Sequence, residues 1–205
     1  MNNENQKIER HPFTPFLPDG CKAVMCGTFP PTQDKWAMDF FYPNFQNDMW
    51  RIFGLFFFNN KEHFFDRSTK TIDKAGIQRL LGEVKVGVGE TATEVVRTRG
   101  NASDKFLEII KPVDLARLLQ KVPECEYVVT TGEKAASVIA SLTDTPVPKM
   151  GDKIKCCVRM ENGTERYFYH WRMPSTSRAY PMKLEKKAEY YAELFKAIEG
   201  RGDRC

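Results

Sequence analysis

Apolar residues recur at helical spacing along several stretches of this chain. Met49, Ile52, Phe53 and Phe56 follow one another at steps of three, one and three residues, which places them on one side of a helix. A second stripe of this kind occupies the last apolar segment of the chain. We therefore expect helices over residues 47–57, 77–81, 114–121, 133–142 and 182–199.

Short apolar runs between these helices are typical of buried strands. Residues 23–26, 84–86 and 127–130 form three such runs. Two longer runs flank Asn162-Gly163, a strong hairpin turn, and predict paired strands over residues 152–160 and 166–173. The Gly87-Val88-Gly89 sequence is expected to end a strand and to open an irregular stretch that runs to Ser103.

Strands that alternate with helices indicate a mainly parallel sheet covered on both faces. The expected fold class is α/β: a three-layer sandwich with a central, mainly parallel four-stranded sheet flanked by helices, plus an antiparallel hairpin strand. The chain shows no internal repeat and no convincing linker. We expect a flexible N-terminal segment over residues 1–19 and a single domain over residues 20–200.

Composition narrows the class of protein further. The 205 residues are 41% hydrophobic and 28% charged, which is ordinary for a soluble globular domain. No apolar run is long enough for a membrane span, and the first ten residues are polar, so we expect a cytoplasmic protein without membrane contact. The six cysteines contain no Cys-x-x-Cys pair and the three histidines are scattered, so no metal site and no cofactor are expected.

The distribution of charge gives a hint of a polyanionic partner. The net charge is +4, and residues 178–187 hold four basic side chains against Glu185, a local sum of 4 − 1 = +3. Basic groups of this kind bind nucleic-acid phosphates without regard to sequence. A charged helix start is also common on a surface that only faces water.

Two loops follow predicted strands and carry the candidate chemistry. The first is Gly27-Thr28-Phe29-Pro30-Pro31, and the second covers residues 174–181, Pro-Ser-Thr-Ser-Arg-Ala-Tyr-Pro. An open α/β sheet binds its ligand in the crevice beyond the carboxyl ends of its strands, which is where both loops are expected. Neither loop has the glycine pattern of a phosphate-binding loop.

These motifs resemble the active-site loops of the uracil-DNA glycosylase superfamily, most closely its hypoxanthine-DNA glycosylase-like and mismatch-specific branch. Gly27-Thr28-Phe29-Pro30 matches the first motif without its usual acidic or amide residue, and residues 46–52, Gln-Asn-Asp-Met-Trp-Arg-Ile, match the segment that follows it. Residues 174–179 match the second motif, with Arg178 in place of proline. Thr131 stands where the superfamily has asparagine, and residues 87–104 resemble a further stretch of it that includes an arginine and Ser-x-Asp.

The resemblance implies a monofunctional, cofactor-free DNA glycosylase that hydrolyses the N-glycosidic bond of a flipped deaminated base, uracil or hypoxanthine. Its partner would be double-stranded DNA with a damaged or mismatched base, and the protein would be a monomer, nucleoid-associated if bacterial. Asn47 carries over as the catalytic amide. Because an amide is not a strong base, fast chemistry would need help from Asp48 or Asp39. The other implied residues are Thr28, Phe29, Phe41, Tyr42 and Thr131 for base binding, and Pro30, Ser175, Thr176, Ser177, Arg178, Tyr180 and Lys183 for DNA binding.

Plainer interpretations stay open for several of these residues. Asn47 suits the N-cap of the helix that follows it, and Phe41 suits the core. Met173 stands where related enzymes have a histidine that stabilises the departing base, and His170 does not simply replace it. The alternatives for the whole chain are a noncatalytic nucleic-acid-binding relative and a nucleoside or nucleotide hydrolase.

Overall fold

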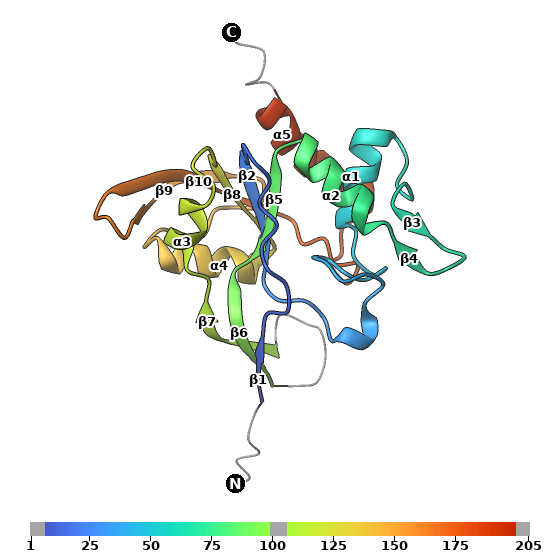
Figure 1. Ribbon diagram of the computed structural model, residues 1–205, viewed down its shortest axis with the longest axis horizontal. Coiled ribbons are helices and arrows are strands. Elements are labelled where there is room, and N and C mark those ends of the chain that lie inside the picture. The colour runs from blue at the N-terminus through green and yellow to red at the C-terminus, as the bar shows by residue number, and fades with distance from the viewer. Residues whose placement is uncertain (1–6, 99–105, 200–205) are drawn as a thin grey trace.

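The centre of the protein is a five-stranded sheet. The computed structural model describes residues 7–98 and 106–199. Four neighbouring strands are parallel, and the fifth, at one edge, is antiparallel to its neighbour (Figure 1). In spatial order the strands are β5 (Val86–Glu90), β2 (Ala23–Gly27), β8 (Tyr127–Thr131), β10 (Glu165–Met173) and β9 (Lys153–Arg159). This confirms the expected α/β fold, with four parallel strands and one strand from the hairpin.

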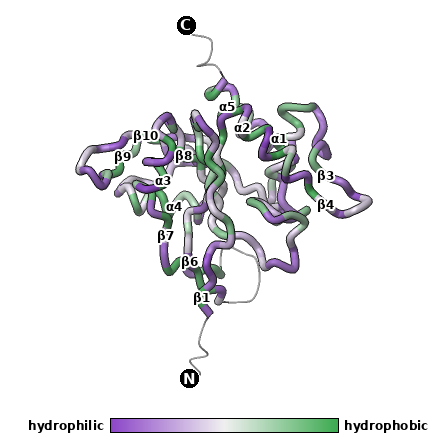
Figure 2. The backbone as a smooth tube through the Cα atoms, viewed as in Figure 1, coloured by the Kyte–Doolittle hydropathy of each residue, from purple (hydrophilic) through white to green (hydrophobic). Residues whose placement is uncertain are grey.

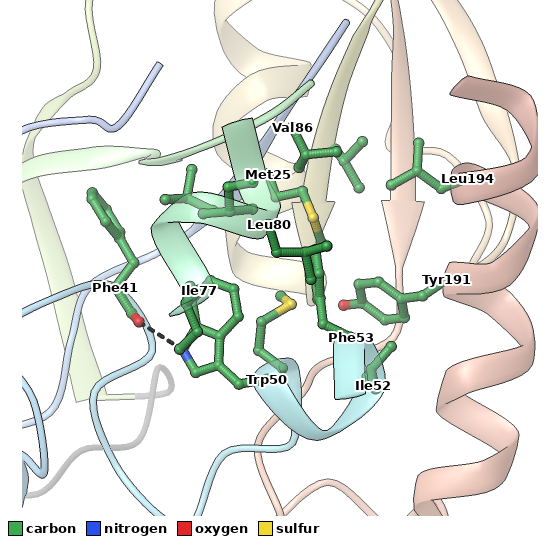
Figure 3. Packing of buried hydrophobic residues seen from close by; sticks show 14 of the residues in the cluster. Met25, Phe41, Trp50, Ile52, Phe53, Ile77, Leu80, Val86, Tyr191 and Leu194 are labelled. Atoms are coloured by element: carbon green, nitrogen blue, oxygen red, sulfur yellow. Dashed lines mark hydrogen bonds between the residues drawn. The ribbon is translucent and has the colours of Figure 1, made fainter. Parts of the chain in front are cut away.

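Helices cover both faces of the sheet, and each face has its own apolar cluster. The larger cluster includes Met25 and Val86 from the sheet and residues of three helices, Trp50, Ile77 and Tyr191 among them (Figure 3). The smaller cluster joins the other face to two helices. The helices are α1 (Met49–Phe58), α2 (Lys74–Glu83) and α5 (Leu184–Glu199) on the first face, and α3 (Leu115–Gln120) and α4 (Glu133–Leu142) on the second.

The hydropathy of the chain follows this layering. Figure 2 shows hydrophobic residues gathered on the central strands and hydrophilic residues along the outer loops. The helical stripe predicted in α1 is correct for its buried members Met49, Ile52 and Phe53, whereas Phe56 is only partly buried. Within the described residues no helix is both long and apolar enough to cross a membrane.

The N-terminal part of the chain differs from the flexible segment expected over residues 1–19. Residues 8–10 form strand β1 (Ile8–Arg10), which pairs with β6 (Ala92–Arg97) in a small antiparallel sheet completed by β7 (Leu107–Pro112). Phe16 also pairs with Val88 of β5. Strand pairing therefore orders this segment, and Phe13 and Phe16 also pack against the larger apolar cluster.

The break expected at Gly87-Val88-Gly89 is also wrong, because these residues lie inside β5. A Cβ atom on Gly87 would lie 3.1 Å from the Phe16 carbonyl oxygen and 3.0 Å from Cys21 Sγ. The glycine thus permits close packing against the N-terminal segment rather than a turn. Part of the stretch expected to be irregular is strand β6, and the matched segment Asn101–Asp104 lies outside the described residues.

Two smaller elements complete the described chain. A short hairpin, β3 (Phe65–Asp66) and β4 (Thr71–Ile72), follows α1, and a 3-10 turn (Gln33–Lys35) lies between β2 and α1. The predicted strands around Asn162-Gly163 are confirmed as a hairpin, with Gly163 at a φ of 82°. That hairpin supplies the edge strand β9.

Candidate functional site

One row of residues marks the carboxyl edge of the parallel sheet. Gly27 of β2 pairs with Glu90 of β5, and Met173 of β10 pairs with Thr131 of β8. A Cβ on Gly27 would lie 3.7 Å from Thr131 Oγ1, so the two halves of the row adjoin. Both loops predicted from the sequence therefore begin at the same edge, in the position where open α/β sheets bind ligands.

Tyr42 packs over this row. Its hydroxyl lies 3.3 Å from Thr131 Oγ1, and a Cβ on Gly27 would approach its ring and hydroxyl to 3.4 Å. Tyr42 has a φ of 52°, which an L-residue adopts only when its surroundings hold it there. Two of the predicted base-binding residues, Tyr42 and Thr131, are thus brought together.

The other predicted base-binding residues are less available. Thr28 is buried, and Phe29 packs beside the small cluster of β6 and β7 with the Arg97 guanidinium 5.5 Å from its ring centroid. Phe41 is 4% exposed and stacks on the His11 ring at 5.4 Å, while its carbonyl accepts a hydrogen bond from Trp50 (Figure 3). The core interpretation therefore holds for Phe41, and Tyr42, which is half-buried, remains as the aromatic candidate for base binding.

The two candidate loops are joined by backbone hydrogen bonds. Asn47 and Ser177 form an isolated antiparallel bridge. The Asp48 N–H donates to the Thr176 carbonyl at 2.7 Å, and the Arg178 N–H donates to the Gln46 carbonyl at 3.0 Å. Segments about 130 residues apart in the sequence therefore lie side by side at the start of α1.

The prediction of Asn47 as the N-cap of α1 is wrong by one residue, because Asp48 holds that position and makes no side-chain capping hydrogen bond. Asn47 Oδ1 instead accepts a hydrogen bond from the Met49 N–H at 2.9 Å, which closes a turn directly before the helix. The side chain is half-buried. A ligand bound by Asn47 would therefore meet the amide NH₂ group, because the oxygen is occupied by the helix.

Asp48 differs from the expectation of a catalytic acid. Its carboxylate is buried, with Oδ1 accepting from Arg178 Nε at 3.1 Å and Oδ2 accepting from Lys187 Nζ at 2.9 Å. Lys187 is fully buried and also donates to the Ser177 carbonyl at 2.8 Å. Both oxygens of Asp48 are therefore held by cations, and this group fixes the second loop to α5 rather than offering a free base.

Lys187 also corrects the picture of a solvated basic helix start. It lies inside the protein, whereas Lys183 and Lys186 are exposed. Arg178 combines two roles, since it pairs with Asp48 while 43% of its side chain stays exposed. Only the exposed part of this basic group is free to meet a nucleic acid.

Arg51 is a positioning residue that the sequence analysis did not single out. It is 2% exposed, and its Nη1 donates to the carbonyls of Phe45 and Asn47 at 3.0 and 3.1 Å. Its Nε donates to Glu62 at 3.2 Å. Burial, followed by the nearby Arg178 charge, lowers the pKa of Arg51. The sequence signal for this role was an arginine between two apolar residues, Trp50 and Ile52, in the matched segment.

A polar cavity of about 340 Å³ opens beside Asp48 and Arg178. Glu62, Glu185, Met182 and Leu184 also line it. Its basic lining residues are Arg51, Lys61, Arg67 and Arg178. The cavity is lined by four cationic and three acidic side chains and lies next to the loop bridge. A phosphate group would be attracted by the cations and repelled by the carboxylates, so it would bind beside the exposed cations.

The remaining DNA-binding candidates occupy different environments. Pro30 is buried, with its carbonyl accepting from Arg97 at 2.6 Å, and Thr176 is 2% exposed, so neither side chain offers a contact surface. Ser175 and Ser177 are half-buried and their hydroxyls accept backbone N–H groups within the loop. Tyr180 is half-buried and Lys183 is exposed, so both are accessible.

Glu90 and His11 form a buried pair that the sequence analysis missed. Glu90 Oε2 lies 3.9 Å from His11 Nδ1, and among the described residues this oxygen has no hydrogen-bond partner. Burial raises the pKa of Glu90 to about 7 and lowers the pKa of His11 to about 4. The sequence analysis expected the strand to end at Gly87, so it did not place Glu90 at the carboxyl end of β5.

His170 lies away from this edge. It is fully buried, its Nε2 lies 2.9 Å from Thr130 Oγ1, and burial lowers its pKa to about 4. It therefore does not take the place of the histidine that Met173 replaces. Within the described ranges no three metal-ligating side chains come together.

Comparison with known proteins bears on the fold. No family model matches the chain, and no curated protein matches it in sequence. Its structure is similar to the solution NMR structure of a "putative uracil DNA glycosylase" from Methanosarcina acetivorans. The TM-score is 0.62 at 18% sequence identity, over 94% of this chain and 99% of that one. At this identity the likeness establishes a shared fold.

Proposed function

We propose that this protein is a DNA glycosylase that hydrolyses the N-glycosidic bond of a flipped deaminated base, uracil or hypoxanthine. The observation that carries the proposal is the bridge between residues 46–48 and 176–178 at the carboxyl edge of the sheet. This bridge joins the two segments that resemble glycosylase motifs. The fold shared with the archaeal protein supports the same class.

The base would enter beside Tyr42 and Thr131. Extruding a base from a duplex costs a few kcal/mol of unstacking, and stacking on an aromatic ring recovers about 1–3 kcal/mol. Tyr42 is the half-buried aromatic residue over the sheet edge, and its hydroxyl is held near Thr131. These two residues would form the wall and the polar end of the pocket.

The chemistry would need an oriented water and donors for the departing base. Water oxygen bonds to the sugar C1′ as the C1′–N bond breaks, and the base leaves with the electron pair and then takes a proton. The Asn47 NH₂ group would donate to the base or the water, because Oδ1 already accepts the Met49 N–H. Glu90 is the carboxyl group of the edge row, and a pKa of about 7 suits proton transfer near neutral pH.

The DNA strand would contact the exposed part of the second loop. Arg178, Tyr180 and Lys183 keep accessible surface there, while Asp48 and Lys187 hold the loop in place. Arg178 would meet a phosphate with the part of its guanidinium not engaged by Asp48.

Base release from matched oligonucleotides carrying uracil, hypoxanthine or xanthine tests this proposal. Asn47→Ser is the sharper variant, since serine keeps an oxygen that can accept the Met49 N–H and loses the NH₂ donor. Removing one such donor lowers rates by about 10²–10³-fold. Asn60→Ser is the matched control, because Asn60 Oδ1 also accepts an N–H two residues further on but lies after the C-terminal end of α1. Equal release by wild type and Asn47→Ser would move the chemistry away from Asn47.

A noncatalytic nucleic-acid-binding protein is the second candidate, favoured by the two cations that occupy Asp48. Salt-sensitive binding to all oligonucleotides without release of any base would establish it. Release from free nucleosides but not from DNA would instead indicate a nucleoside hydrolase.

A further inference from the structure

One face of the β9–β10 hairpin carries aromatic residues on β10 and basic residues on β9. Directly paired residues of antiparallel strands share a face. Trp171 pairs with Lys153, and Tyr169 pairs with Lys155. Continuing outward, Tyr167 pairs with Cys157 and Glu165 with Arg159. We refer to these eight residues as the aromatic–basic face.

The aromatic side chains of this face form a continuous row that leaves the core. Trp171 is buried within the larger cluster, whereas Tyr169 and Tyr167 are 37% and 52% exposed. Tyr127 of β8 stacks beside Tyr169, with ring centroids 6.0 Å apart and planes at 28°. The row therefore runs from the interior to open solvent along a single strand.

Lysine side chains lie against these rings. Lys153 Nζ is 4.3 Å from the Trp171 ring centroid, and Lys155 Nζ is 4.7 Å from that of Tyr167. Lys153, Lys155 and Arg159 are exposed. Glu165 is the acid of the face and accepts from the Tyr167 hydroxyl, so three cations stand against one carboxylate, a sum of 3 − 1 = +2.

The opposite face of the hairpin has an ordinary structural role. Phe168 and Cys156 are buried in the smaller core cluster, with Ile154 and Val158 packed against it. An antiparallel sheet with one solvated face usually places polar residues on that face. Two exposed tyrosines at alternating positions are therefore a departure that packing does not require.

We propose that the aromatic–basic face binds single-stranded DNA, with bases stacked on Tyr167 and Tyr169 and phosphates beside Lys153 and Lys155. Flat rings flanked by cations are the combination that holds unpaired nucleotides without sequence preference. A second protein chain added to the β9 edge is disfavoured, because lysines on an edge strand oppose strand pairing. The proposal is independent of base excision, since the face lies on the hairpin and not at the loop bridge.

Binding of the full chain to undamaged, fluorescently labelled oligothymidylate, followed by anisotropy, tests this inference. Tyr167→Ser/Tyr169→Ser should weaken binding at least about tenfold. Lys153→Gln/Lys155→Gln should lower the slope of log affinity against log salt by about 1.4, since each phosphate left without its lysine accounts for about 0.7. Ile110→Ser/Lys111→Gln on β7 is the control, since Ile110 is a 43%-exposed strand residue in a different sheet.

Circular dichroism and thermal melting of each variant distinguish weakened DNA binding from unfolding. Absence of binding by the wild-type chain, or equal binding by the tyrosine variant, would overturn the proposal. A change of sedimentation with no change in DNA affinity would assign the face to protein association and would also overturn it. Because the oligonucleotide is undamaged, failure here is distinguishable from failure of base release.

Discussion

The ion pair between Lys187 and Asp48 gives the sharpest prediction on stability. Lys187→Met would leave Asp48 Oδ2 buried without its 2.9 Å partner and would also remove the 2.8 Å bond to the Ser177 carbonyl. Removing one partner of a buried pair costs about 3–5 kcal/mol. Arg178 still neutralises the other carboxylate oxygen, so we expect the lower end, about 3 kcal/mol.

Urea unfolding measured by fluorescence checks this value. In a chain of this size, a loss of about 3 kcal/mol lowers the melting temperature by about 6–12 °C. Lys183→Met is the control, because Lys183 is exposed on the neighbouring turn and its replacement should change the free energy of unfolding by less than about 0.5 kcal/mol.

The double variant Lys187→Met/Asp48→Asn separates charge burial from packing. It removes the charge that would be stranded, so it should be more stable than Lys187→Met alone by about 1–3 kcal/mol. A single variant that costs less than about 1 kcal/mol, or a double variant whose cost is the sum of the two single ones, would refute the reasoning.

Two further predictions concern strand β5. The raised pKa of Glu90 gives stability that is lost as pH rises from 4.5 toward 7, and the lowered pKa of His11 gives stability that is lost as pH falls from 6.5 toward 4. The two effects oppose each other between pH 4.5 and 6.5, and Glu90→Gln leaves only that of His11. In this variant the free energy of unfolding should therefore rise with pH in that range, by up to about 1.4 kcal/mol per pH unit. A free energy of unfolding from urea titrations that does not change with pH would contradict this. Gly87→Ala should destabilise the protein by about 1–3 kcal/mol, because its Cβ would lie 3.1 Å from the Phe16 carbonyl oxygen and 3.0 Å from Cys21 Sγ. Gly82→Ala on the open side of α2 should stabilise it by up to about 1 kcal/mol, and equal urea midpoints for the two variants would count against the tight packing at Gly87.

The sequence predicted those parts of the fold that depend on a few neighbouring residues. The turn at Asn162-Gly163 and the helix α4 (Glu133–Leu142) could be predicted because turn chemistry and apolar spacing are contained in a few neighbouring residues. The alternation of strands and helices then indicated the parallel sheet. The loop positions at its carboxyl edge followed from the same pattern.

Features that depend on distant partners could not be predicted. The sequence predicts a break at Gly87, because the residues next to Gly87 do not reveal that Phe16 packs closely against it. It predicts a surface position for Lys187 and a free acid at Asp48, because their partnership joins positions 139 residues apart. It places Phe41 in base binding, although an N-terminal histidine covers the ring.

The bridge between the two loops also determines when the candidate site can form during synthesis of the chain. Residues 46–48 leave the ribosome well before their partners at 176–178, and Lys187, which anchors Asp48, follows Asp48 by 139 residues. Closing so long a loop costs entropy that is recovered only after the contact forms. A nascent chain can therefore build most of the sheet before the site exists. The bridge is held in place only once α5 has been synthesised and Lys187 has reached Asp48.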